Sequence, residues 1–75
     1  MAGIVIDTRG LSCPLPVLKV RKLMRSVTPG TAVQILATDP LAEYDVRAYC
    51  AASACEFRSV NKLEDGVLSM VIQKR

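Results

Sequence analysis

Two prolines one residue apart, Pro14 and Pro16, fix the place where the first helix of this 75-residue chain can begin. Proline is tolerated in the first turn of a helix, where backbone N–H groups have no intrahelical partner, but it breaks a helix further inside. The apolar residues that follow recur at helical spacing: Val17, Val20, Met24 and Val27. The pattern predicts a helix over residues 14–27, which Thr28-Pro29-Gly30 ends.

The rest of the chain predicts four strands and one further helix. Asp39 is placed to cap that second helix, with Pro40 at its first position and Ala52 near its end. The expected strands are the short apolar run 3–6, the largely apolar segment 32–37, and the segments 55–63 and 67–73, which form an antiparallel hairpin around Glu64-Asp65-Gly66.

The order strand–helix–strand–helix–strand–strand predicts an α+β fold. Right-handed crossovers place both helices on one face of a mixed four-stranded sheet, which gives a two-layer α/β sandwich. We expect a single domain over residues 1–75, since a chain this short has one core. The predicted core residues are Ile4, Ile6, Val17, Val20, Met24, Val33, Ile35, Val46, Leu68, Met70 and Ile72.

Cysteine usage limits the chemistry that the chain can carry. The three cysteines are few and odd in number, no pair has Cys-x-x-Cys spacing, and there is no histidine. A zinc site would need all three thiols and carboxylates besides, so we expect no metal and no cofactor. Reduced thiols and the lack of an apolar run of membrane-spanning length predict a cytoplasmic protein that does not enter a membrane.

Cys13 is the candidate reactive thiol, because it directly precedes the predicted helix start. The positive end of a helix and the nearby Arg9 favour a thiolate, so we expect the Cys13 pKa to be depressed. The alternative is a small helix-capping side chain. Cys50 falls on the apolar face of the second helix and is expected in the core, whereas Cys55 either packs at a strand start or is a second exposed thiol.

The charge of +3 arises from ten basic and seven acidic residues. Much of the excess lies on the first helix and at the end of the sequence: Lys19, Arg21, Lys22, Arg25, Lys74 and Arg75. We interpret Arg9, Lys19, Lys22 and Arg25 as a docking surface for an acidic partner, with a merely solvated helix face as the alternative.

The chain resembles the TusA/SirA-type family of small sulfur-carrier proteins over nearly its whole length. Two blocks of residues carry the resemblance: Asp7, Gly10, Leu11, Cys13, Pro14 and Pro16, then Thr38, Asp39, Pro40 and Asp45, with Cys50 near the helix end. Cys-Pro-x-Pro by itself is a weak signal, but it is specific when it follows a strand, opens a helix and precedes Asp-Pro before a second helix.

The resemblance implies that Cys13 accepts sulfane sulfur as a persulfide. A cysteine desulfurase or rhodanese-type donor supplies the sulfur, and a downstream acceptor protein removes it, for tRNA thiolation, molybdenum-cofactor assembly or another relay; selenium is an alternative cargo. On this interpretation the chain is a carrier, a monomer when free, rather than a self-sufficient enzyme. Asp7, Gly10, Pro14, Pro16, Asp39 and Pro40 support the motif.

One residue departs from the family pattern. Many members carry a Gly-His-Glu-like sequence where this chain has Ala54-Cys55-Glu56, which affects partner choice rather than Cys13 chemistry. Two other functions stay open. The first is a thiol–disulfide redox protein that pairs Cys13 with Cys50 or Cys55. The second is a nucleic-acid-binding or regulatory domain that uses the basic helix, although we expect no stable direct nucleic-acid binding, since two tyrosines are too few for base stacking.

Overall fold

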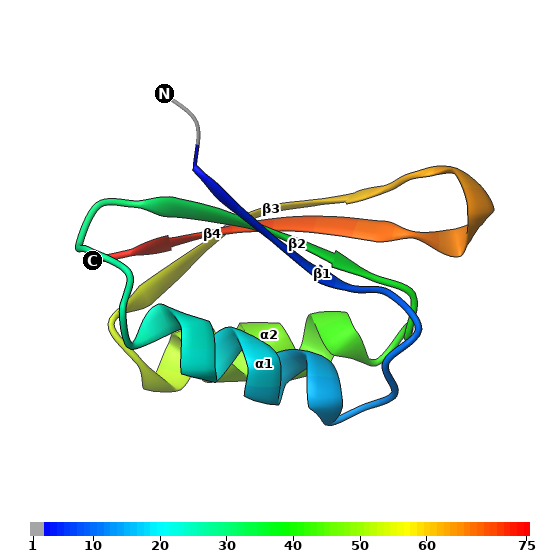
Figure 1. Cartoon of the computed structure of the whole chain (residues 1–75), viewed down its shortest axis with the longest axis horizontal. Coiled ribbons are helices and arrows are strands. Elements are labelled where there is room, and N and C mark those ends of the chain that lie inside the picture. The colour runs from blue at the N-terminus through cyan, green and yellow to red at the C-terminus, as the bar shows by residue number, and fades with distance from the viewer. Residues whose placement is uncertain (1–2) are drawn as a thin grey trace.

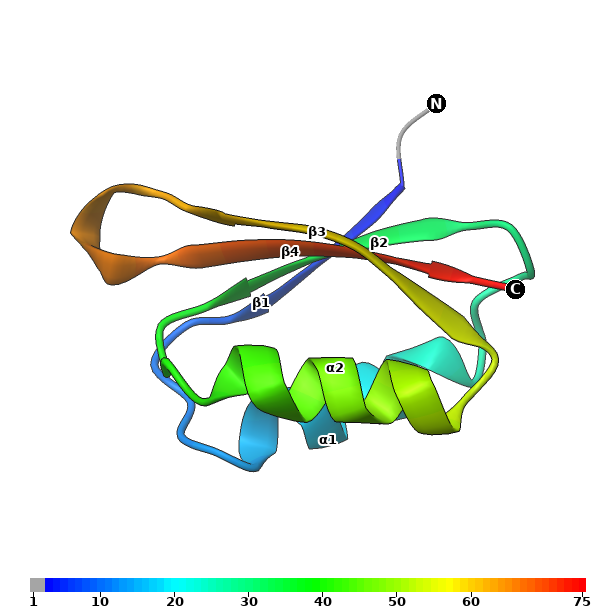
Figure 2. The same ribbon diagram turned by 180° about the vertical axis from the view of Figure 1, so that it is seen from behind.

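The computed structural model describes residues 3–75 and consists of two layers, a four-stranded sheet and two helices that cover one of its faces (Figures 1 and 2). In chain order the elements are β1 (Ile4–Thr8), α1 (Leu15–Met24), β2 (Ala32–Ala37), α2 (Ala42–Ala52), β3 (Cys55–Lys62), a 3₁₀ turn (Glu64–Gly66) and β4 (Leu68–Lys74). The predicted fold class and element order are confirmed. Within residues 3–75, no helix has the length and apolar character needed to cross a membrane.

The sheet is mixed, with the strand order β1-β2-β4-β3. β1 and β2 are parallel, and β4 is antiparallel to both of its neighbours, β2 and β3. Ile35 of β2 lies beside Ile6 of β1 on one side and Met70 of β4 on the other. Strand β4, the last in the sequence, therefore occupies an interior position between β2 and β3.

The core lies between the sheet and the two helices. Ile35, Met70 and Ile72 of the two inner strands are fully buried against Val20 of α1 and Val46 of α2. Most of the predicted core is confirmed, and two assignments are wrong. Ile4 is 37 % exposed because the first residue of β1 lies where that strand rises away from the helices (Figure 1). Val17 is only half-buried, in an open depression between α1 and α2.

Both helices are shorter than the sequence predicts. After Met24 the α-helical pattern is replaced by a tighter, 3₁₀-type turn, in which the N–H groups of Ser26 and Val27 donate to carbonyls three residues earlier. Lys74 of β4 then caps this end: its Nζ donates to the Met24 and Val27 carbonyl oxygens at 2.8 and 2.7 Å. Two carbonyls at and just after the end of α1 therefore accept hydrogen bonds from a side chain of β4.

The start of α2 corrects the predicted cap. The helix begins at Ala42, two residues after Pro40, and Leu41 is its capping residue. The Asp39 carboxylate accepts the N–H of Leu41 at 2.9 Å, and the Asp39 carbonyl accepts the N–H of Ala42 at 3.0 Å. Asp39 thus holds the turn that precedes the helix, which leaves its second carboxylate oxygen available to another segment.

The β3–β4 hairpin forms where it is predicted. Its turn contains two residues with positive φ, Asp65 at 61° and Gly66 at 72°. The N–H of Leu63 donates to the Val67 carbonyl at 2.7 Å and closes the turn. The hairpin places β4 beside β3, and the other edge of β4 pairs with β2.

Candidate functional site

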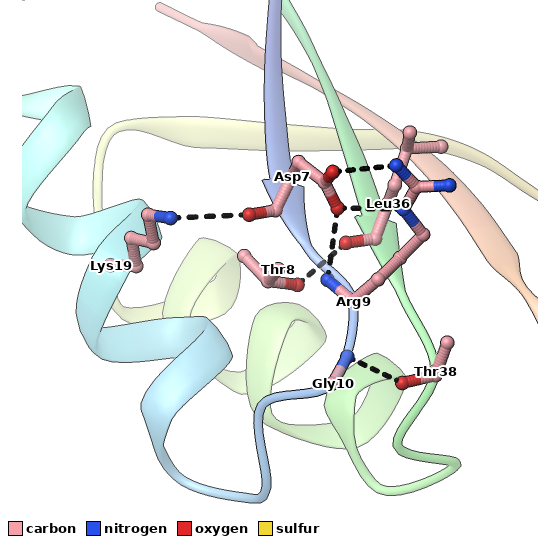
Figure 3. Close-up of polar contacts among 7 residues, drawn as sticks. All are labelled: Asp7, Thr8, Arg9, Gly10, Lys19, Leu36 and Thr38. Atoms are coloured by element: carbon pink, nitrogen blue, oxygen red, sulfur yellow. Dashed lines mark hydrogen bonds and ion pairs between the residues drawn. The ribbon is translucent and has the colours of Figure 1, made fainter.

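The candidate site lies where the β1–α1 and β2–α2 loops meet. Because β1 and β2 are parallel, both loops leave the same edge of the sheet. Two hydrogen bonds join them (Figure 3): buried Thr8 donates through Oγ1 to the Leu36 carbonyl at 2.6 Å, and the N–H of Gly10 donates to Thr38 Oγ1 at 2.9 Å. The loop that leads to Cys13 is therefore anchored on the neighbouring strand.

Asp7, Arg9 and Gly10 shape the turn after β1. The Asp7 carboxylate accepts the Arg9 backbone N–H at 3.0 Å and two guanidinium N–H groups at 2.9 and 2.7 Å (Figure 3). These bonds from Arg9 lower the pKa of Asp7 to about 2. Gly10 has a φ of +83°, as its position in the turn suggests, and a side chain there would be strained.

Cys13 is held by two aspartates from the second loop and from α2. Its backbone N–H donates to Asp39 Oδ2 at 2.6 Å, and its thiol donates to Asp45 Oδ2 at 2.6 Å. Asp45 lies in the first turn of α2. The two hydrogen bonds into Asp39, from Leu41 first and from Cys13 next, lower the pKa of that carboxyl. Asp39 is therefore the charged group that bridges the two loops.

Pro14 and Pro16, which follow Cys13 in the sequence, fix the position at which α1 begins. Pro14 caps α1, after a cis Cys13–Pro14 peptide bond, and Pro16 is buried in its first turn. The N–H of Leu15 donates to the Ser12 carbonyl at 2.8 Å. Cys13 thus sits before the helix, half-buried, between a rigid helix start and the two aspartates.

The prediction of a depressed Cys13 pKa is wrong. The hydrogen bond to Asp45 is the main cause that raises the pKa of Cys13 to about 11, followed by burial and by the charges of Asp45 and Asp39. Ionisation would place a thiolate against carboxylates, and the Arg9 side chain that was expected to favour it is bound to Asp7 instead. A weak helix-end attraction does not offset a direct carboxylate contact.

The predicted basic docking residues have different surroundings. Arg9 pairs with Asp7, and Lys19 Nζ donates to the Asp7 carbonyl at 3.2 Å (Figure 3). Lys22, in the last turn of α1, and Arg25, just after it, are exposed and form no ion pair with any of residues 3–75. Only Lys22 and Arg25 are therefore fully available to a partner, whereas Arg9 and Lys19 also stabilise the turn beneath Cys13.

The other two cysteines lie away from this site. Cys50 and Cys55 are buried, and their sulfur atoms are 2.9 Å apart. Cys55 is thus a packed thiol rather than an exposed one, and Cys50 is a core residue as predicted. Within residues 3–75, no three His, Cys, Asp or Glu side chains come together as metal ligands would. A redox pair that includes Cys13 has no geometric support, since Cys50 and Cys55 contact each other.

Sequence reasoning assigned no role to several residues around Cys13. Asp45 was part of the quoted motif, but its spacing from Asp39 does not show that it reaches Cys13. Leu15, Leu18 and Leu41 are about half exposed. Leu15 and Leu18 could have been found as apolar helix residues outside the predicted core positions Val17, Val20 and Met24. Cys13, Asp39 and Asp45 form the candidate site.

The comparison with known families identifies the chain. The profile of the family described as "Sulfurtransferase TusA" matches residues 4–74. The protein belongs to this TusA family, as the resemblance predicts.

Named relatives of similar length agree with the family. An Archaeoglobus fulgidus protein named "Putative sulfur carrier protein" is 41 % identical over 68 residues, covering 91 % of this chain and 88 % of that protein. A Neisseria meningitidis protein with the same description is 33 % identical over 70 residues and covers 93 % of each chain. A crystal structure of a SirA-like protein from Desulfitobacterium hafniense superposes with a TM-score of 0.81 at 22 % identity, over 93 % of this chain and 95 % of that one, and confirms the fold.

Proposed function

We propose that this protein is a sulfur carrier that holds sulfane sulfur as a persulfide on Cys13. The observation that carries the proposal is that Cys13 is the one half-buried thiol, presented between a proline-started helix and two aspartates, whereas Cys50 and Cys55 are buried. Family membership and the relatives named as sulfur carriers support it. A carrier of this kind docks a sulfur donor and a sulfur acceptor in turn.

The transfer step follows from thiol exchange chemistry. Cys13 loses its proton and its sulfur attacks the outer sulfur of a donor persulfide. The S–S bond of the donor breaks as a new S–S bond forms on Cys13, and the donor leaves as a thiolate that takes up one proton. No net oxidation occurs. Asp45, which already accepts the hydrogen bond of the thiol at 2.6 Å, is positioned to receive the proton that leaves.

The site lacks the shape of a small-molecule pocket. An open depression lined by residues that include Pro14, Val17, Asp45 and Tyr49 lies between α1 and α2 beside Cys13. Such a shallow surface suits contact with a protein better than enclosure of a metabolite. The exposed side chains of Leu15 and Leu18 provide apolar contact area for docking.

The partners we propose are a cysteine desulfurase or rhodanese-type donor and a downstream acceptor protein. The raised pKa of Cys13 means that the free carrier keeps its thiol protonated at neutral pH. A cationic group of the donor that approaches Asp45 and Asp39 would weaken their hold on Cys13 and favour the thiolate. The carrier would then become reactive chiefly when it is docked.

Sulfur loading followed by peptide mapping tests the proposal. Incubate the protein with a cysteine desulfurase and cysteine, digest it with trypsin, and weigh the peptides. Peptide 10–19 contains only Cys13, whereas peptide 48–58 contains Cys50 and Cys55. We expect a mass gain of one sulfur atom on the first peptide, and loss of loading in C13S. Sulfur found mainly on the second peptide, or equal loading of C13S, would refute the proposal.

A further inference from the structure

Cys50 and Cys55 form a close pair of thiols that the Cys13 site does not use. Cys50 lies in the last turn of α2 and Cys55 is the first residue of β3. Their sulfur atoms are 2.9 Å apart, and the residues are only 6 % and 3 % exposed. The two thiols therefore have each other as their nearest reactive partner.

The backbone between the two cysteines is held in place by hydrogen bonds. The N–H of Ser53 donates to the Cys50 carbonyl at 3.4 Å, and the N–H of Cys55 donates to the Ser53 carbonyl at 2.9 Å. The N–H of Arg75 donates to the Ala54 carbonyl at 3.0 Å and ties this turn to the end of β4. The fold thus positions the two sulfurs together, so their contact does not depend on chance encounters of a flexible loop.

The pair borders on solvent at an open depression of about 310 Å³, whose lining includes both cysteines, two basic residues, Arg47 and Arg75, and one acidic residue, Glu56. Arg47 is held there over the Phe57 ring, with its guanidinium carbon 4.1 Å from the ring centre. Burial, followed by the Cys55 contact, raises the pKa of Cys50, and Arg75 opposes this in part. Arg47 also pairs with Glu43 at 2.9 Å. A small disulfide can reach the thiols from this depression, which presents the guanidinium groups of Arg47 and Arg75 beside the Glu56 carboxylate.

We propose that Cys50 and Cys55 are a dithiol site that a low-molecular-weight disulfide oxidises to an intramolecular disulfide. One protein thiolate attacks the small disulfide, forms a mixed disulfide and releases one small thiol. The other protein thiolate then attacks the protein sulfur of that mixed disulfide and releases the second small thiol. Two protein thiols are oxidised, one small disulfide is reduced to two thiols, and the protons balance.

Cys13 is excluded from this reaction by its position. The Cys13 thiol is hydrogen-bonded to Asp45 in the first turn of α2. Cys50 lies five residues after Asp45 on the same helix, which separates the two positions by a rise of about 7.5 Å along the helix axis. The disulfide therefore leaves Cys13 as a free thiol.

Equilibration with glutathione buffers tests the proposal on the whole chain. After acid quenching and alkylation, trypsin releases both cysteines in peptide 48–58 and Cys13 in peptide 10–19. We expect peptide 48–58 to lose two hydrogen atoms in mass and peptide 10–19 to take one alkyl group. The reaction should accelerate as pH rises, because burial raises the pKa of Cys50.

The same equilibrium in concentrated urea provides the control, because it measures the two cysteines without the fold. We expect the equilibrium constant for disulfide formation to be at least about tenfold larger in the native protein, equivalent to about 1.4 kcal/mol. C13S should give the same native constant as the wild type. An equal or smaller constant in the native protein, a peptide 48–58 that stays reduced or carries only glutathione, or a disulfide that includes Cys13 would overturn the proposal.

Discussion

At the scale of single residues, the feature that decides the behaviour of Cys13 is a carboxylate. Asp45 accepts the thiol hydrogen bond at 2.6 Å and is the main cause that raises the pKa of Cys13 to about 11. A carrier thiol that is protonated when free resists alkylation and oxidation between transfers, because the thiolate is the reactive form.

We predict that D45N makes Cys13 more reactive. Asparagine has nearly the same shape but no charge, so the thiolate is no longer opposed and the pKa falls toward its ordinary value. The thiolate fraction at pH 7 grows about tenfold for each unit of fall, and lower intrinsic nucleophilicity offsets part of that gain. We expect iodoacetamide to label peptide 10–19 about tenfold faster at pH 7 than in the wild type.

A matched control for D45N lies on the same helix. E43Q removes a carboxylate that pairs with Arg47 at 2.9 Å and does not contact Cys13, so its labelling rate should equal that of the wild type. The wild-type rate should continue to rise with pH toward about 11, whereas that of D45N levels off at lower pH. An unchanged or slower rate in D45N would show that Asp45 does not control the thiol.

At the scale of the elements, β1 and β2 carry the loops that meet at Cys13, and Thr8 joins their ends. Thr8 is fully buried and its Oγ1 donates to the Leu36 carbonyl at 2.6 Å. The predicted first strand ended at Ile6, because Asp7-Thr8-Arg9-Gly10 has the composition of a turn, whereas β1 extends to Thr8.

We predict that T8V destabilises the protein by about 1–2 kcal/mol, since valine keeps the shape and removes a buried hydrogen bond. For a domain of this size, thermal unfolding should shift down by about 4–8 °C per kcal/mol. Circular dichroism melting measures this. T28V is the control, because the Thr28 hydroxyl bonds Thr31 on the surface; a melting temperature of T8V equal to that of T28V would contradict the prediction.

The positions of the helices and strands could be predicted because they depend on residues close together in the sequence. The prolines at 14 and 16 predicted the start of α1 to within one residue, and the segment 32–37 predicted β2. The contacts of Cys13 could not be predicted, since Asp39 and Asp45 are 26 and 32 residues away in sequence. The helix-end argument predicted the wrong direction for the Cys13 pKa, because it considered only neighbouring residues in the sequence and not the carboxylates of Asp39 and Asp45.

At the scale of the whole molecule, charge is spread unevenly around the site. Lys22, in the last turn of α1, and Arg25, the residue that caps its C-terminal end, are exposed. Arg9 and Lys19, which are predicted to belong to the same docking surface, are engaged with Asp7.

We predict that the double reversal K22E/R25E slows sulfur loading from an acidic donor surface several-fold at low salt, with little effect at high salt. Rim charges act mainly on association rates, which salt screens. Loading rates at both salt concentrations measure this, with iodoacetamide labelling of Cys13 expected to stay unchanged. R58E/K62E, which makes the same charge change on the edge strand β3, should be loaded with sulfur at the wild-type rate. Equal loading rates in the two double variants would contradict the prediction and indicate that the basic residues of the first helix are only a solvated face.

The interior position of β4 has a consequence for how the protein is made. A ribosome delivers β1, α1, β2, α2 and β3 before β4, yet β2 and β3 are joined only through β4. Until that strand emerges, β2 and β3 each present an unpaired edge, and the carbonyls of Met24 and Val27 lack their hydrogen bonds from Lys74. The nascent chain therefore cannot complete its sheet one strand at a time, because the sheet forms only after β4 has been synthesised.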